Sequence, residues 1–154
     1  MRRSNLIKGV ICGLMLTTVL GSVAYAKTDT YSKYVGINGN GRKTFNGIAG
    51  VYEAELRNTS ENGDFRVAAT STSTTQRIFT VEAVRSHYYA GKVQDRDVES
   101  EVIGRNRVIR AAIGRNLWDE EFYDYRGTAK AYINTFVYAG LSDNYTWTFY
   151  PRYN

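Results

Sequence analysis

The sequence predicts an all-β fold, a single antiparallel β-sandwich of about seven or eight strands, with a small β-barrel as the alternative. Three observations favour it. The chain has 13 tyrosines but one proline. Its aromatic and β-branched residues fall in short runs separated by Asn, Gly, Ser and Asp, as is typical of strands and turns. Long runs with helical periodicity are scarce, which argues against a helical domain.

The first 26 residues resemble a secretory signal rather than part of the fold. Arg2, Arg3 and Lys8 precede an uncharged apolar stretch that ends in Ala24-Tyr25-Ala26. This order of charge, apolar run and small residues predicts cleavage after Ala26 and leaves residues 27–154 as one secreted domain. We expect no membrane span in the mature form.

The cysteine and charge distributions restrict the partners. The only cysteine, Cys12, lies in the predicted signal, so the domain is expected to lack disulfides, which suits a bacterial exterior. Three of the 20 basic residues and none of the 15 acidic residues lie there too. The remaining balance of charges is close to neutral, and this argues against a nucleic-acid partner.

The expected strands follow the alternation of apolar and polar side chains along the chain. Strands are expected at 34–37, 52–57, 65–70, 78–84, 129–138 and 145–150. Residues 38–41, Asn-Gly-Asn-Gly, are a dense turn signal. Residues 104–117 fit both helical spacing and strand alternation, and we favour a strand that runs to about Ala112.

An acidic row occupies every second position of one segment and consists of Asp95, Asp97, Glu99 and Glu101. It fails as an EF-hand loop, because the sixth and twelfth places hold Ser100 and Asn106 instead of Gly and Glu. A hairpin that turns at Ile103-Gly104 explains it better. That hairpin sets Glu101 opposite Arg105 and Glu99 opposite Arg107 on a solvated face.

The same hairpin would turn Val98 and Val102 toward the core. It therefore predicts that the two valines face the core while the acidic row faces the solvent.

Two segments are candidates for ligand binding. Residues 117–127 interleave aromatic and acidic side chains, and such a mixture can stack on sugars and accept hydrogen bonds from their hydroxyls. The alternative is a loop anchored in the core by Trp118 and Phe122. The second segment, His87 to Tyr89, holds the only histidine. The ligand-binding candidates are Trp118, Asp119, Glu121, Tyr123, Tyr125, His87, Tyr88 and Tyr89.

No catalytic motif, metal-ligand pattern or phosphate loop is evident, so no catalytic residue, metal or cofactor is predicted. We expect a secreted, non-catalytic binding protein of a bacterial envelope or exterior that recognises a glycan or a protein. One alternative is an exported bacteriocin-like or pore-forming toxin that uses the polar run 69–76. Another is a small cell-wall hydrolase that uses Glu82, His87 or the acids near Asp119. The sequence leaves strand order and oligomeric state open.

Overall fold

The computed structural model describes most of the predicted domain. The described residues are 26–36, 38–58, 62–87, 91–116, 123–133, 135 and 140–152. For Asn62, His87, Arg115, Asn116 and Arg152 it describes only the backbone. The predicted signal lies almost wholly outside these ranges and stays a prediction. No helix among the described residues has the length and apolarity that crossing a membrane requires.

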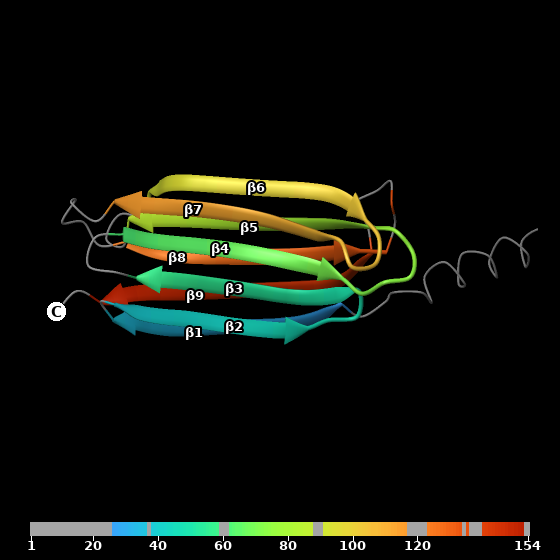
Figure 1. Ribbon diagram of the computed structural model, residues 1–154, viewed down its shortest axis with the longest axis horizontal. Helices are drawn as coiled ribbons and strands as arrows, with labels where there is room; N and C mark the ends of the chain where they lie inside the picture. Colours follow the sequence, from blue (N-terminus) through green and yellow to red (C-terminus); the bar gives the residue numbers. More distant parts are fainter. Residues whose placement is uncertain are drawn as a thin grey trace, which may run out of the picture.

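Nine strands build the described part of the chain, as Figure 1 shows. They are β1 (Lys27–Gly36), β2 (Gly39–Asn46), β3 (Gly50–Asn58), β4 (Asn62–Ser71), β5 (Arg77–His87), β6 (Val93–Ile103), β7 (Val108–Asn116), β8 (Tyr123–Tyr132) and β9 (Leu141–Arg152). Sheet A has the order β1-β9-β8-β5-β6 and sheet B the order β2-β3-β4-β7. All neighbours are antiparallel except β1 and β9. The all-β prediction is confirmed, with two sheets in a sandwich-like arrangement.

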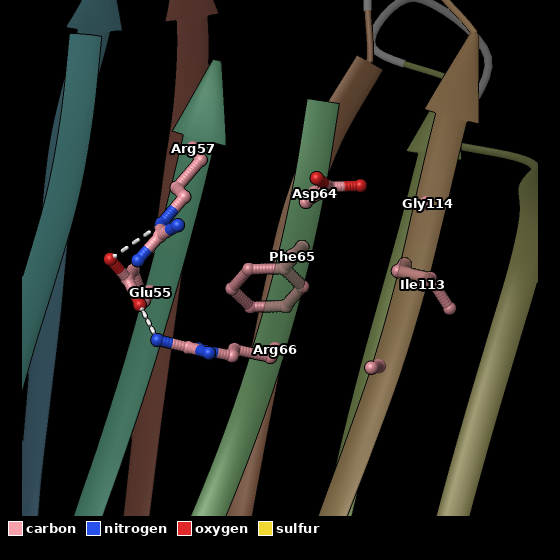
Figure 2. A pocket seen from close by; sticks show the side chains of 8 residues that line it. Glu55, Arg57, Asp64, Phe65, Arg66, Ile113 and Gly114 are labelled. Carbon is pink, nitrogen blue, oxygen red and sulfur yellow. Dashed lines mark hydrogen bonds and ion pairs between the residues drawn. The ribbon is translucent and has the colours of Figure 1, made fainter. Parts of the chain in front are cut away.

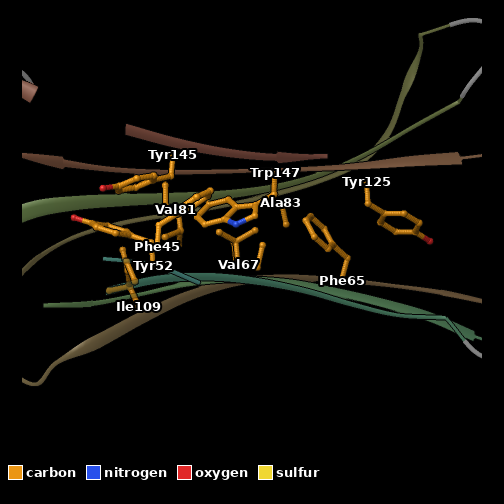
Figure 3. Packing of buried hydrophobic residues seen from close by; sticks show 14 of the residues in the cluster. Phe45, Tyr52, Phe65, Val67, Val81, Ala83, Ile109, Tyr125, Tyr145 and Trp147 are labelled. Carbon is orange, nitrogen blue, oxygen red and sulfur yellow. The ribbon is translucent and has the colours of Figure 1, made fainter. Parts of the chain in front are cut away.

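The core is the layer of side chains between the two sheets (Figure 3). Sheet A contributes Trp147, which is fully buried, and sheet B contributes Phe45, whose ring stacks on Tyr145 with centroids 4.8 Å apart. Each fully buried large apolar side chain contributes about 1.5–3 kcal/mol from its removal from water. Because these side chains alternate with outward-facing ones, each strand buries one face and exposes the other.

The alternation located most strands but not all of their boundaries. The turn expected at 38–41 includes Asn38, whose φ is 59°, but β2 already begins at Gly39. The segment 108–116 is strand, as favoured, and it continues past Ala112. The strand expected to reach residue 138 ends at Tyr132, and Ile133 is already 40% exposed. Residues 136–139 lie outside the described part.

The hairpin predicted around Gly104 is wrong, because the chain crosses from one sheet to the other there. β6 pairs with β5 and β7 pairs with β4. Glu99 is therefore opposite Val81 and Glu101 opposite Phe79, not opposite arginines. The acidic row thus shares the inner face of sheet A but projects beyond the core, alongside β7.

The predicted orientation of the two valines is also wrong. Val98 and Val102 lie on the outer face of sheet A and are 43% and 41% exposed. The acidic row instead meets the edge of sheet B, where Asp97 Oδ2 accepts a hydrogen bond of 2.7 Å from the backbone N–H of Ala112. Inward charges on an edge strand also discourage pairing with another chain.

A buried carboxylate joins the two sheets. Asp143 on β9 is fully buried and accepts hydrogen bonds from the backbone N–H groups of Ile48 and Ala49, both 2.7 Å, and from Tyr52 Oη at 2.6 Å. A Cβ at Gly47 would lie 2.6 Å from Asp143 Cγ and from Tyr52 Cε2. Only glycine therefore lets the β2–β3 turn approach this carboxylate so closely.

We expect Asp143→Asn to lower the free energy of unfolding by about 2–4 kcal/mol, because an amide nitrogen would face a backbone N–H or the Tyr52 hydroxyl. Urea denaturation measures the change. The matched control is Asp64→Asn, whose side chain is exposed and should change stability by less than about 0.5 kcal/mol. Equal effects of the two substitutions would show that the buried hydrogen bonds contribute little.

Candidate functional site

Two predicted ligand-binding residues are core residues. The side chains of Tyr123 and Tyr125 are only 6% and 1% exposed. The ring of Tyr125 packs against Phe65 with centroids 5.6 Å apart, and the guanidinium of Arg85 lies 4.8 Å from the centroid of the Tyr123 ring. Neither residue therefore belongs to the exposed aromatic surface that was expected. Their outward neighbours along β8 are polar.

The structure does bring the two predicted segments to one end of sheet A. His87, the last residue of β5, is the register partner of Tyr123, the first residue of β8. The side chain of His87 is not described, and Tyr88, Tyr89, Trp118, Asp119 and Glu121 lie outside the described residues. Their part in ligand binding stays a prediction.

A different exposed surface runs along β1 and β9 on the outer face of sheet A. The two strands are parallel and in register, so their outward side chains form four rows of two. We name this surface the hydroxyl–tyrosine face, and it consists of Thr28, Thr30, Ser32 and Tyr34 on β1 with Asn144, Thr146, Thr148 and Tyr150 on β9. The β1 members are exposed and the β9 members are partly exposed. No charged side chain belongs to it.

The local sequence explains why this surface is polar on the outside. In β9 the inward positions hold Tyr145, Trp147 and Phe149, which are buried. The positions between them must then point outward, and they hold Thr146, Thr148 and Tyr150. Threonine suits such a position, because its branched side chain favours strands while its hydroxyl stays hydrated.

Two tyrosine rings close one end of this face. Tyr34 is 58% exposed, and its ring centroid lies 5.2 Å from that of Tyr150, with the planes 37° apart. Neighbouring aromatic rings on a strand pair support each other, which limits their motion. The exposed ring of Tyr34 and the partly exposed ring of Tyr150 together offer an apolar surface next to hydroxyl groups.

The neighbouring strand β8 adds charges beside the face. Asp124 and the exposed Arg126 point outward from β8, and Arg126 is the register partner of Thr148. Burial raises the pKa of the Asp124 carboxyl above its ordinary value of 3.8. A ligand on the tyrosines would therefore find both a hydrogen-bonding carboxyl group and a cation at its edge.

A shallow concavity of about 250 Å³ lies on sheet B (Figure 2). The concavity forms because β7 carries small residues, Ala112 and Gly114, on its outer face. Its walls come from β3 and β4. The lining residues are Glu55, Arg57, Asp64, Phe65, Arg66, Ala112, Ile113 and Gly114.

The charged wall of this concavity is already paired. Glu55 is only 2% exposed and accepts hydrogen bonds from Asn40 Nδ2 at 2.9 Å, Arg57 Nε at 3.1 Å and Arg66 Nη2. Burial opposes ionisation of Glu55, but these donors outweigh it and hold the pKa of the carboxyl below its ordinary value. The cluster is therefore best explained as a structural ion pair that joins β3 to β4.

Metal-binding geometry is not found in the described part of the chain, where no three acidic, histidine or cysteine residues gather closely enough to hold an ion. The acidic row is spread along β6, and Asp95 forms an ion pair with Arg85 at 3.3 Å. The hydroxyl–tyrosine face remains the surface whose groups are exposed and whose chemistry suits a ligand.

Comparison with known proteins shows distant structural likeness only. No protein-family model and no curated protein sequence matches the chain. The N-terminal domain of PorA matches with a TM-score of 0.37 and 9% identity over 79% of this chain and 87% of that chain. The Escherichia coli curli protein CsgC matches with a TM-score of 0.36 and 6% identity over 71% and 97%.

A PapD-like domain of human CEP192 matches with a TM-score of 0.32 and 7% identity over 84% of this chain and 83% of that chain. Likenesses at this level carry no argument about function. The function must therefore be inferred from the surfaces of the chain itself.

We expect the stability that Glu55 contributes to depend on pH. Because its pKa is lowered in the folded state, this contribution is present above the ordinary value of 4.5 and is lost as the pH falls through the folded value. Near neutral pH, Glu55→Gln should cost about 1–2 kcal/mol by urea denaturation. The difference between variant and unaltered protein should shrink in acid, and a gap that stays constant would contradict the assignment. Glu99→Gln, at an exposed position, is the control.

Proposed function

We propose that the protein is a non-catalytic carbohydrate-binding protein of a bacterial envelope or exterior, and that it binds glycans on the hydroxyl–tyrosine face. The observation that carries the proposal is the contact between the exposed Tyr34 and the partly exposed Tyr150 at the end of an in-register array of polar side chains, most of them hydroxyls. The secreted location rests on the signal predicted from residues 1–26.

The chemistry of this face matches that of a sugar ring. A pyranose has an apolar face of C–H groups, which packs on an aromatic ring, and a rim of hydroxyl groups, which both donate and accept hydrogen bonds. Tyr34 and Tyr150 provide the rings, and their own hydroxyls provide a polar edge. Thr148 and Ser32, in the next row, offer further hydroxyl partners that donate or accept as required.

The absence of charge from this face also favours a neutral ligand. A polyanion would be expected to meet several lysines or arginines, but the eight residues of the face are uncharged. The described charges beside it on β8 have both signs, with Asp124 on one hand and Arg126 and Lys130 on the other. A neutral polyhydroxylated ligand loses little solvation free energy here, since each hydroxyl can exchange water for a side-chain partner.

A binding role is favoured over hydrolysis by the acids near this face. Glycoside hydrolysis usually needs two carboxyl groups placed across one glycosidic bond. On the outer face of sheet A, Glu82 is held by Arg96 Nε at 2.5 Å and by the Thr128 hydroxyl at 3.3 Å. Because Glu82 is held in these contacts, Asp124 is the remaining carboxyl group beside the tyrosines among the described residues.

We expect Tyr34→Ala to weaken glycan binding about tenfold, which corresponds to the loss of about 1.4 kcal/mol of stacking. The fold should tolerate this change, because the side chain is largely exposed. Isothermal titration calorimetry with chitohexaose and with soluble peptidoglycan fragments measures it. Tyr132→Ala is the matched control. It lies at the end of β8 that is far from Asp124 and from the tyrosine pair, and the variant should bind as the unaltered protein does.

Two results would contradict the proposal. One is that the unaltered protein binds neither glycan at millimolar concentration. The other is that Tyr34→Ala and Tyr150→Ala bind a glycan as tightly as the unaltered protein. Perturbation of Tyr34 and Tyr150 signals in NMR spectra during titration would support the proposal directly.

A further inference from the structure

The first strand forms an open edge of sheet A. β1 has β9 as its neighbour on one side, and no strand of the described chain pairs with its other side. Nine of its ten residues are exposed or partly exposed, and Val35 is the buried one. Figure 1 shows β1 and β2 along one side of the molecule and β6 and β7 along the other.

The opposite side of the sandwich is protected against further strand pairing. There the acidic row projects from β6, and Asp97 accepts a hydrogen bond from the backbone N–H of Ala112 on β7. The pairing of β5 with β6 also has an irregularity between Arg85 and Ser86. Charges and bulges of this kind hinder edge-to-edge association. β1 also carries charged residues on its inward positions, but their charges have both signs, and its ten pairs with β9 have no irregularity.

The charges on β1 complement one another when the strand meets a second copy of itself. In an antiparallel pair centred on Tyr31, Asp29 of each copy lies opposite Lys33 of the other, which places two opposite charges in direct cross-strand contact. Shifting the centre to Thr30 sets Lys27 opposite Lys33, and shifting it to Ser32 sets Asp29 opposite Val35. Of these three registers, the one centred on Tyr31 pairs Asp29 with Lys33, and the third charged residue of β1, Lys27, then lies opposite Val35.

The backbone of β1 suits the same register. The N–H of Thr30 donates to Asp29 Oδ1 at 2.8 Å in an exposed setting, which indicates that it points away from β9. A partner strand must replace this local contact, and its loss would release the Asp29 carboxylate to face Lys33. Alternate residues share that direction, so Thr28, Thr30 and Ser32 face a partner strand with their backbone groups. Centring on Tyr31 sets Thr30 opposite Ser32, as a hydrogen-bonded pair on each side of the axis.

We propose that two copies of this chain associate through β1, in an antiparallel pair with a two-fold axis at Tyr31. The two five-stranded A sheets then join into one continuous sheet. Asp29 and Lys33 lie in non-hydrogen-bonded pairs, where side chains on neighbouring strands approach most closely. An interface built mainly from one strand on each side is small, so the dimer dissociates in the micromolar to millimolar range.

The dimer would join the two hydroxyl–tyrosine faces side by side on one sheet surface. A polymer that spans both faces would bind more tightly than a fragment that reaches one face, because the second contact becomes intramolecular. This consequence depends on the proposed function, whereas the dimer itself does not.

A charge exchange tests the register. Sedimentation equilibrium over a series that reaches millimolar concentration should show a dimer for the unaltered protein. Asp29→Lys or Lys33→Asp alone should abolish it, since each places like charges opposite one another twice. The double variant Asp29→Lys with Lys33→Asp should restore it. A monomer at every concentration, or no rescue in the double variant, overturns the proposal, and Glu99→Lys is the control for charge reversal elsewhere.

A cysteine placed on the axis gives a second, independent test. In a Cys12→Ser background no other thiol is present. Tyr31→Cys should form a disulfide-linked dimer on mild oxidation, because residue 31 faces its own copy at a distance that a disulfide can span. Thr28→Cys should not, because residue 28 faces residue 34. Equal cross-linking of the two variants, or none with Tyr31→Cys, overturns the register.

Discussion

The buried Asp143 carboxylate is the contact on which the arrangement of the two sheets most depends. It belongs to β9 of sheet A, and its hydrogen-bond donors belong to β3 and to the turn before it in sheet B. A carboxylate without those donors would lose its hydration and gain nothing in return. Its burial is therefore compatible with one placement of the turn, and that placement sets one sheet against the other.

The aromatic core follows from this contact. Tyr52, which donates to Asp143, also has its ring 5.0 Å from that of Tyr145, and Tyr145 stacks on Phe45. Burial, and then the hydrogen bond to Asp143, raise the pKa of the Tyr52 hydroxyl so far that it stays a donor at all ordinary pH values. Burial and the charges of Asp143 and Asp29 raise the pKa of Tyr145 to about 12. Both phenols are therefore neutral and fit an apolar layer.

The alternation of apolar and polar residues was sufficient to predict the all-β fold class, because it can be recognised within each strand separately. It could not predict which strands become neighbours. At Gly104–Val108 the chain makes a turn, with Asn106 at a φ of 65°, that looks in sequence like that of a hairpin. The apolar residues Ile109, Ala111 and Ile113 complete sheet B instead. Pairing with β4 buries them, whereas pairing with β6 would leave sheet B without its fourth strand.

The site was harder to predict than the fold for a related reason. Aromatic residues next to acids suggested an exposed surface at 117–127, yet Tyr123 and Tyr125 occupy the inward positions of β8. The alternation in β9 already separated Tyr150 from the buried Phe149. Tyr34, by contrast, becomes part of a surface only through the parallel pairing of β1 with β9. The pairing joins residues at opposite ends of the domain, and no local pattern reports it.

The two sides of the sandwich differ in a way that links the face to the edge. On the β6–β7 side, the inward carboxylates of the acidic row hinder pairing with another chain. On the β1 side, the outward positions carry hydroxyls and a tyrosine, and the other positions carry charges of both signs. A flat, uncharged face needs an edge without a strong charge of one sign, since such a charge would extend its field over the neighbouring rows. The composition that keeps the face neutral also leaves β1 able to accept a strand, so the proposed binding surface and the proposed dimer edge have one physical origin.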